Sequence, residues 1–353
     1  VQVGVSFYTP YGSSIDWTKD WAGSVLSQSV DLKVFTIQPT VSWRIIPKLS
    51  IGAGLMISWG SVDLNKGLVT AASMDKMMGV TGMFEQGATP FNNTTPAAIN
   101  LTGTSDVAVG VNVGAMYEIN RQWNVGASFR TEMKMKVGAG SASVSYANAV
   151  AQNIIEKIVK IDQDNFKASM PCPWVLSLGT SYKPIESLIL AFDARLTGWH
   201  AYKSLDVEFL DPDLARFNQY IEKKYSNSWC FSLGGQYSVT KRFDVRLGLM
   251  VDTTPVNDNY YNPETPGMTK IEPTVGLSFR PIPSLSIDLG FMYIHGCGKK
   301  GASVEYEDLI GKTMYGQLGP DMASQLGFST TGKFTADYRL HAFAPSIGIS
   351  YSF

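Results

Sequence analysis

Long hydrophobic runs, charge and cysteine are all scarce in this chain of 353 residues. No run of 18 or more apolar residues is present, which excludes a membrane-spanning helix. The net charge of -1 gives no electrostatic basis for nucleic-acid binding. Charged residues make up 17%, against the roughly 25% of an ordinary soluble domain. A mean hydropathy of -0.01 still allows a membrane barrel, because barrel strands hide their hydrophobicity in alternation.

Cysteine and histidine are too few and too scattered to indicate a reactive or metal-binding site. The three cysteines are far apart in the sequence and odd in number, which argues against a disulfide framework or a zinc site: Cys172, Cys230 and Cys297. The three histidines lie on or near loops, without the spacing of a catalytic triad or a metal site: His200, His295 and His341. We therefore expect no enzyme activity, no metal and no cofactor.

The abundant feature is a two-faced strand pattern. In the final stretch, Ala342 to Phe353, large apolar residues alternate with small or polar ones. Because successive side chains of a strand point to opposite faces, this stretch separates an apolar solvent from a polar one. The same pattern recurs along the chain and gives about twelve expected strands: Val1–Pro10, Val34–Arg44, Leu49–Ser58, Asp106–Glu118, Trp123–Val137, Trp174–Tyr182, Leu188–Trp199, Trp229–Ser238, Phe243–Val251, Glu272–Phe279, Leu285–His295 and Ala342–Phe353.

The connections between these strands alternate between short and long. Turns of a few residues, such as Ile45–Lys48 and Asn120–Gln122, are followed by segments as long as Gly60–Ser105. Short turns at one end and long loops at the other are typical of a transmembrane antiparallel β-barrel, with the short turns in the periplasm. We expect an all-β fold with one barrel domain over residues 1–353, embedded in membrane lipid.

The polar faces of the strands then line the lumen. Charges facing lipid would cost roughly 2–4 kcal/mol for Arg or Lys near the midplane, and inward parity avoids this cost. In the strand Trp123–Val137, the same parity rule places Met133 and Met135 outward. The inward charges form either a substrate path or a network of salt bridges that holds the strands: Arg130, Glu132, Asp193, Arg195, Asp244, Arg246, Arg280 and Asp288.

The long loops carry apolar segments with helical spacing. We expect helices around Ala71–Met78, in Tyr146–Ile161, and in Pro212–Tyr225, where Asp211 stands at the N-cap position. The first two either form an exposed groove that captures a hydrophobic ligand or pack on each other as a cap over the barrel. The candidate capture residues are Leu68, Val69, Met74, Met77, Met78, Phe84, Ile154, Ile155 and Ile158.

Several longer motifs resemble one family. The opening VGVSFYTPYG with DWTKDWAG, the blocks MPCPWVLSLGTSYKP and YSNSWCFSLGGQYSV, the run GLMVDTTPV and the terminal SYSF are similar to the FadL-type long-chain fatty acid transporters of Gram-negative outer membranes. The resemblance covers essentially the whole chain. It implies a fourteen-stranded barrel plugged by an N-terminal hatch, which takes hydrophobic molecules from an outer groove into an internal pocket. Release is then expected sideways, at a kink in the family's third strand.

By position, the family's kink matches Pro10, Tyr11 and Gly12. Proline removes a ladder donor and glycine permits unusual backbone, so local pairing should fail there. The alternative is that these residues begin an extracellular turn. The family's hatch and first two strands have no counterpart before Val1, so we expect either a processed or trimmed chain or a protein that differs from the family in this part.

The resulting hypothesis is passive uptake of fatty acids or other hydrophobic, detergent-like molecules across the outer membrane. The alternative is a structural barrel subunit whose loops bind a protein partner in that membrane. A transporter should contain an apolar pocket that leads to a gap in the wall, whereas a scaffold should be sealed inside.

Overall fold

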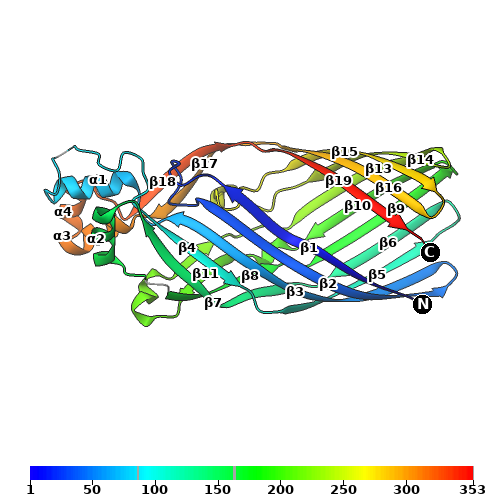
Figure 1. Ribbon diagram of the computed structural model, residues 1–353, viewed down its shortest axis with the longest axis horizontal. Helices are drawn as coiled ribbons and strands as arrows, with labels where there is room; N and C mark the ends of the chain where they lie inside the picture. Colours follow the sequence, from blue (N-terminus) through cyan, green and yellow to red (C-terminus); the bar gives the residue numbers. More distant parts are fainter. Residues whose placement is uncertain (86, 162–163, 353) are drawn as a thin grey trace.

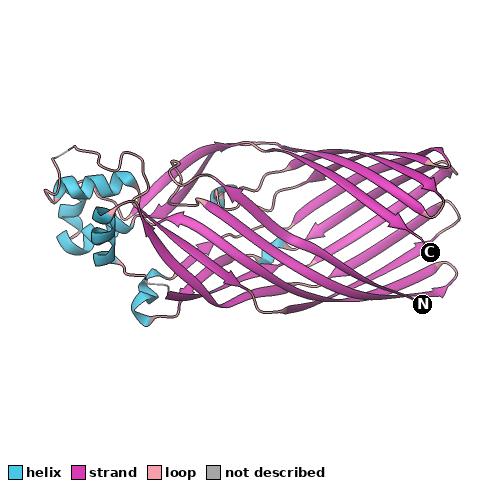
Figure 2. Cartoon of the chain, viewed as in Figure 1, coloured by secondary structure: helices cyan, strands magenta, loops and turns pink. Residues whose placement is uncertain are grey.

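The computed structural model describes residues 1–85, 87–161 and 164–352, and strands dominate it (Figure 2). Within these ranges the nineteen strands are β1 Gln2–Asp16, β2 Ser29–Ile46, β3 Leu49–Gly67, β4 Ala97–Thr104, β5 Ala108–Glu118, β6 Trp123–Arg130, β7 Met133–Tyr146, β8 Asp164–Cys172, β9 Val175–Ile185, β10 Leu188–Thr197, β11 Ser204–Phe209, β12 Gln219–Glu222, β13 Ser228–Thr240, β14 Phe243–Asp252, β15 Lys270–Ile282, β16 Leu285–Gly296, β17 Lys299–Glu307, β18 Thr331–Tyr338 and β19 His341–Tyr351. The helices are α1 Ala71–Val80, α2 Ala149–Ile158, α3 Leu309–Leu318 and α4 Pro320–Gln325, with short 3-10 segments η1 Trp199–Ala201, η2 Pro212–Phe217 and η3 Asp258–Tyr260.

Twelve of the described strands form one antiparallel meander. It runs in the order β1, β2, β3, β5, β6, β9, β10, β13, β14, β15, β16 and β19, each paired with the next. Each of these strands overlaps one of the twelve expected from the sequence, so the predicted all-β barrel architecture is confirmed. Phe353, the expected last residue of the final strand, lies outside the described residues.

The other strands extend the wall at one end of the meander. β4, β7, β8, β11 and β12 follow one another on top of β5, β6, β9, β10 and β13, and β17 pairs with β18 as a separate hairpin. For example, β3 has 19 residues, whereas a strand of about 9–11 residues is long enough to cross a bilayer. Figure 1 shows helices α1 to α4 gathered at this extended end, here named the cap, and both chain termini at the opposite end.

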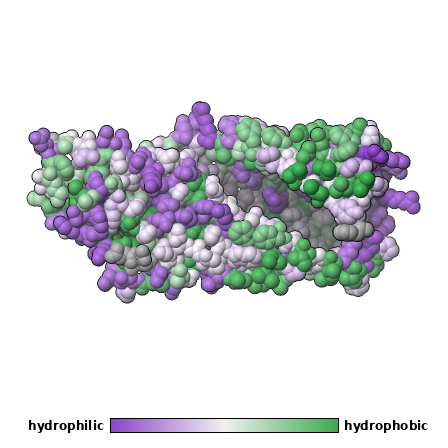
Figure 3. All heavy atoms as spheres, in the orientation of Figure 1, coloured by the Kyte–Doolittle hydropathy of each residue, from purple (hydrophilic) through white to green (hydrophobic). Residues whose placement is uncertain are grey.

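The outer face of the meander is apolar. Its exposed side chains include Phe7, Val41, Leu247, Val275, Leu277 and Ile349. Figure 3 shows hydrophobic residues over the strands near the termini and more hydrophilic residues toward the cap. Among the described residues, no helix is both long and apolar enough to cross a membrane. The outward side chains of the strands form a surface suited to lipid.

The first and last strands of the meander each have one neighbour. β1 pairs with β2 and β19 pairs with β16, and no pairing joins β1 to β19 in the part of the chain that is described. Val3 is 80% exposed on β1 and Ile347 is 72% exposed on β19, against 52% for Val275 on β15, which has neighbours on both sides. Between the positions of these strands the surface in Figure 3 is hollowed.

Two sequence-based expectations are wrong. The expected helix Pro212–Tyr225 is only the 3-10 segment η2, capped by Asp211 as predicted, followed by strand β12. β12 pairs with β11, so the sheet ladder satisfies its backbone instead of a helix. Met133 and Met135 face inward and are buried, because Thr131 and Glu132 break the strand between β6 and β7 and reset its alternation.

The two other expected helices form, with shorter bounds in the second case. α1 begins after Thr70, whose side chain accepts a hydrogen bond from the Ser73 backbone N–H. α2 begins only after Asn148, because Tyr146 still belongs to β7. Helices α3 and α4, in the long segment after β16, were not expected from the sequence.

The packing of the cap predicts opposite effects for two glycines of α3. A Cβ added at Gly311 would overlap the Ser329 carbonyl oxygen, whereas a Cβ at Gly316 meets no heavy atom within 4 Å. We expect Gly311→Ala to loosen the cap and speed protease cleavage between residues 296 and 340. Gly316→Ala should slow it, because alanine favours a helix over glycine by about 1 kcal/mol. Equal cleavage of the two variants would contradict this packing.

Candidate functional site

The predicted kink residues lie at an irregularity in β1, which continues through them to Asp16. Tyr8 pairs with Thr36 and Tyr11 with Val34, so Thr9 and Pro10 together face Phe35 alone. Such an extra residue is a β-bulge, which re-aims the following side chain. Both Thr36 and Val34 are buried inward residues, so the bulge turns the Tyr11 side chain into the lumen.

Tyr11 reaches across the lumen. Its hydroxyl donates a hydrogen bond of 2.7 Å to the carbonyl of Pro173, at the junction of β8 and β9. In the meander, β2, β3, β5 and β6 stand between β1 and β9. The bond therefore joins distant parts of the wall. The Arg130 guanidinium lies 5.7 Å from the Tyr11 ring centroid, and the ring of Trp199 makes an edge contact with it.

Around Tyr11 a cluster of apolar side chains from β1, β2, β3, β7 and β8 lies in the lumen. We name it the septum: Tyr11, Val34, Met56, Met133, Met135 and Cys172. Met56 has no exposed surface, and the other members except Tyr11 are at most 5% exposed. Flexible methionine side chains suit an irregular gap of this kind.

On the cap side of the septum lies an apolar cavity of about 770 Å³, here named the inner cavity. That volume is in the range of small-molecule sites, roughly 300–1,000 Å³. Its lining extends from the bulge to the base of the cap and includes Pro10, Tyr11, Gly12, Phe166, Ala168, Met170, Trp199, Leu205, Val207 and Met268. Below the septum, the lumen is polar, with a cavity lined by Gln38, Asn112, Ser128, Arg130 and Ser177. The large apolar cavity therefore lies on the cap side of the septum.

A second cavity, of about 740 Å³, adjoins the first toward the hairpin β17–β18. We name it the outer cavity, and it shares Leu64, Leu205, Val207 and Glu264 with the inner one. The Glu264 carboxylate pairs with Lys223 Nζ at 2.6 Å, and the Lys223 side chain is 1% exposed. This buried ion pair stands at the boundary between the two cavities.

Tyr202 is a neutral part of the inner cavity. Burial raises the pKa of its phenol well above the ordinary value, and the nearby Glu264 carboxylate adds to the shift. The ring makes an edge contact with Tyr225 at a centroid distance of 5.3 Å. Tyr202 therefore presents an uncharged ring to a ligand at any physiological pH.

Most candidate capture residues are buried in the cap. Met74, Met78 and Ile155 have no exposed surface, and all belong to one cluster with α3 residues such as Ile310. Leu68 lines the outer cavity, while Phe84 is 41% exposed. The remaining candidates, Val69, Met77, Ile154 and Ile158, are buried in the cluster or packed against it. Their role in ligand capture stays a prediction, and in this conformation they hold the cap together.

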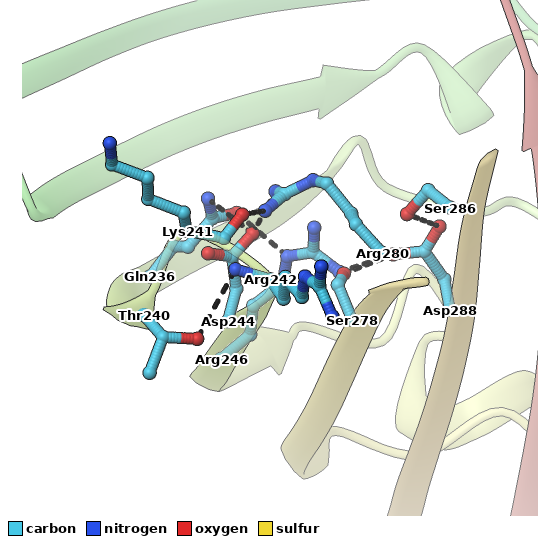
Figure 4. A network of polar contacts seen from close by, with 10 residues as sticks. All are labelled: Gln236, Thr240, Lys241, Arg242, Asp244, Arg246, Ser278, Arg280, Ser286 and Asp288. Atoms are coloured by element: carbon cyan, nitrogen blue, oxygen red, sulfur yellow. Dashed lines mark hydrogen bonds and ion pairs between the residues drawn. The ribbon is translucent and has the colours of Figure 1, made fainter. Parts of the chain in front are cut away.

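Half of the predicted lumen charges form one network, shown in Figure 4. Arg246 Nη1 lies 3.0 Å from Asp288 Oδ1, and Arg280 pairs with Asp244, which has no exposed surface. Arg246 Nε also donates to Gln236 Oε1 over 2.7 Å. These residues come from the adjacent strands β13, β14, β15 and β16. The network ties neighbouring strands together near the short turns.

The other predicted lumen charges stand apart from this network. Arg130 lies beneath Tyr11, and Asp193 and Arg195 are exposed on β10. Glu132 is exposed in the break between β6 and β7. Within the described ranges, no group of three or more His, Cys, Asp or Glu side chains is arranged to hold a metal ion.

A family model described as outer membrane protein transport protein (OMPP1/FadL/TodX) matches residues 1–353. The chain belongs to this family. Outer membrane protein P1 of Haemophilus influenzae is 20% identical over 360 residues, spanning 99% of this chain and 72% of that protein. The long-chain fatty acid transport protein of Escherichia coli K12 is 20% identical over 308 residues, spanning 83% and 67%.

Solved structures of FadL/TodX-type proteins share the fold. A Pseudomonas aeruginosa FadL homologue superposes with a TM-score of 0.76 at 18% identity, covering 99% of this chain and 74% of that one. The Pseudomonas putida toluene transporter TodX gives 0.61 at 14% identity, covering 99% and 77%. At these identities the likeness shows the fold alone. Membership of the family identifies this chain as an outer membrane transport protein of the Gram-negative type rather than an enzyme.

The polar network predicts which lumen carboxylate this FadL-family barrel needs for stability. Asp244→Asn should lower the free energy of unfolding by about 1–3 kcal/mol, because Arg280 loses its charged partner inside the wall. Asp193→Asn, on an exposed lumen position, should stay within about 0.5 kcal/mol. Urea unfolding in lipid vesicles measures both. An equal decrease in the free energy of unfolding of the two variants would contradict a role of the network in holding neighbouring strands together.

Proposed function

We propose that this chain carries out passive uptake of hydrophobic small molecules, long-chain fatty acids among them, across the outer membrane. The observation that carries the proposal is that the apolar inner cavity extends to the bulge at Pro10, Tyr11 and Gly12. The ligand would enter through the outer cavity, lose its water in the inner cavity and leave sideways through the wall at the bulge. Burial of a long alkyl chain would drive entry, at about 0.8 kcal/mol per CH₂ group.

The septum supports sideways release. A ligand in the inner cavity meets Tyr11 and the buried methionines below it, and the lumen beyond them is polar. Transfer of an alkyl chain into that polar lumen would lose the free energy that was gained when the chain was buried in the inner cavity. The bulge, by contrast, interrupts the ladder between β1 and β2 and faces lipid on its outer side. The lower-cost exit for an apolar ligand is therefore through the wall.

Cationic groups at the cavity rim favour an amphipathic acid over a pure hydrocarbon. Lys270 lines the inner cavity but is paired with Asp252 at 3.1 Å. Arg339 also lines it, is exposed, and has no ion pair among the residues that the structure describes. Arg339 would take the carboxylate of a fatty acid whose chain extends toward Val207 and Tyr11. The toluene transporter TodX and the fatty acid transport protein of Escherichia coli are both relatives, so both ligand classes belong in the test.

A structural barrel that binds a protein partner is the second candidate function. The cap, with exposed Phe84 and Met322, would serve such a role. An apolar cavity of this size has no use in a sealed scaffold, which is why we place uptake first.

Filling the inner cavity tests the binding step. Ala168 lines the cavity on β8, and Ala168→Trp should weaken binding of a fluorescent fatty acid at least about tenfold, because the indole occupies the space of the ligand. Ala127→Trp, at an exposed position on β6, serves as the matched control. Titration of the detergent-solubilised protein gives both affinities. Unchanged affinity in Ala168→Trp would place the ligand elsewhere.

Removing the bulge tests the release step. Deletion of Thr9 together with Pro10→Val should restore an unbroken ladder between β1 and β2 while Tyr11 stays opposite Val34. We expect slower fatty acid uptake into vesicles that contain this variant, with unchanged ligand affinity. Pro39→Val on β2, away from the bulge, is the control. Uptake at the wild-type rate would overturn release at the bulge while leaving the binding site intact.

A further inference from the structure

Two of the chain's three histidines stand side by side on the outer face of the barrel. His295, near the end of β16, and His341, at the start of β19, are directly opposite each other in the strand register. Their Nδ1 atoms are 3.4 Å apart and their ring centroids 5.0 Å apart. Both side chains are exposed. The two histidines are 46 positions apart in the sequence, so they form no local metal-binding motif.

The surroundings place this pair at the cap-side boundary of the lipid-facing surface. On the same face, Phe291 stacks on Phe343, and Tyr293 stacks on both Phe343 and His341. Aromatic residues gather where the hydrocarbon meets the headgroup region. His295 lies two residues beyond Tyr293, or about 7 Å along the strand. The pair is thus open to water and to ions at the outer membrane surface.

The spacing of the two nitrogens suits a transition-metal ion. Two nitrogens bound about 2.0–2.1 Å from one tetrahedral zinc ion lie roughly 3.4 Å apart. The unprotonated form of His341 Nδ1 is the one that binds metal, and a metal there would take the place of the Tyr293 hydroxyl, which lies 2.7 Å from that nitrogen. Binding of an anion would instead require both rings to be protonated. That would bring two positive charges together, because the Nδ1 atoms are 3.4 Å apart.

We propose that His295 and His341 form a two-histidine chelate for a borderline divalent metal such as Zn²⁺, Cu²⁺ or Ni²⁺. Imidazole nitrogen is a preferred ligand of these ions, whereas Mg²⁺ and Ca²⁺ prefer oxygen. Water or other ligands complete the coordination, since the described residues supply no third His, Cys, Asp or Glu there. The metal would link β19 to its one neighbour, β16, at the cap-side end. This site is independent of the proposed cargo.

The test uses the full chain in detergent micelles, stripped of metal with a chelator and titrated with ZnCl₂ in a calorimeter. Wild-type protein should bind one Zn²⁺ and should not bind MgCl₂. His341→Ala and His295→Ala should each weaken Zn²⁺ binding at least about tenfold, because a single imidazole remains. His200→Ala, which changes the remaining histidine, should leave it unchanged. Zn²⁺ should also raise the unfolding temperature of the wild type but not of the His341 variant.

A second readout guards against a misfolded variant. With Cu²⁺ in place of Zn²⁺, electron paramagnetic resonance should show two nitrogen ligands in the wild type and one in His341→Ala, with far-ultraviolet circular dichroism unchanged. The proposal is overturned if the wild type fails to bind Zn²⁺, or if His341→Ala binds it as tightly as the wild type does. Binding of anionic lipid vesicles that depends on the pair, without Zn²⁺ binding, would also overturn it.

Discussion

Backbone N–H and C=O groups at membrane depth must be paired, because hydrocarbon offers them no hydrogen bonds. The antiparallel meander from β1 to β19 satisfies this constraint strand by strand. It also fixes the alternation of side chains, with Val275 and Leu277 toward lipid and Ser278 toward the lumen. β1 and β19 each pair along one edge, so in a bilayer their second edges require cover as well.

Two departures from regular strand pairing shape the interior of the barrel. The bulge at Thr9 and Pro10 turns Tyr11 across the lumen, and the break at Thr131 and Glu132 turns Met133 and Met135 inward to meet it. The resulting septum divides an apolar cavity from a polar lumen. Proline accounts for the first departure, since it cannot donate to the ladder. The transport path that we propose therefore lies where strict alternation fails.

The sequence predicted the membrane strands because alternation is a local property, and each expected strand, such as Phe243–Val251, overlaps an observed one. Pro10 lies at the register shift between Tyr8 and Tyr11, and its role as a lateral-opening kink stays a prediction. The inner cavity was not predictable, because Trp199, Val207 and Met268 come from segments far apart in the chain. The sequence placed Met133 on the outward face, which is wrong, because no residue type marks the two-residue break at Thr131 and Glu132. Likewise, the sequence could not show that part of the expected helix Pro212–Tyr225 is strand β12, because that strand forms by pairing with β11.

In the uptake that we propose, an apolar ligand occupies the inner cavity, above Tyr11, before it leaves through the wall. The most direct measurement is a crystal structure of the protein soaked with a fatty acid brominated at the end of its chain, with the bromine located by anomalous scattering. We expect a bromine peak inside the cavity bounded by Tyr11, Val207 and Met268. Bromine found only in the polar lumen below the septum, or only on the cap, would contradict it.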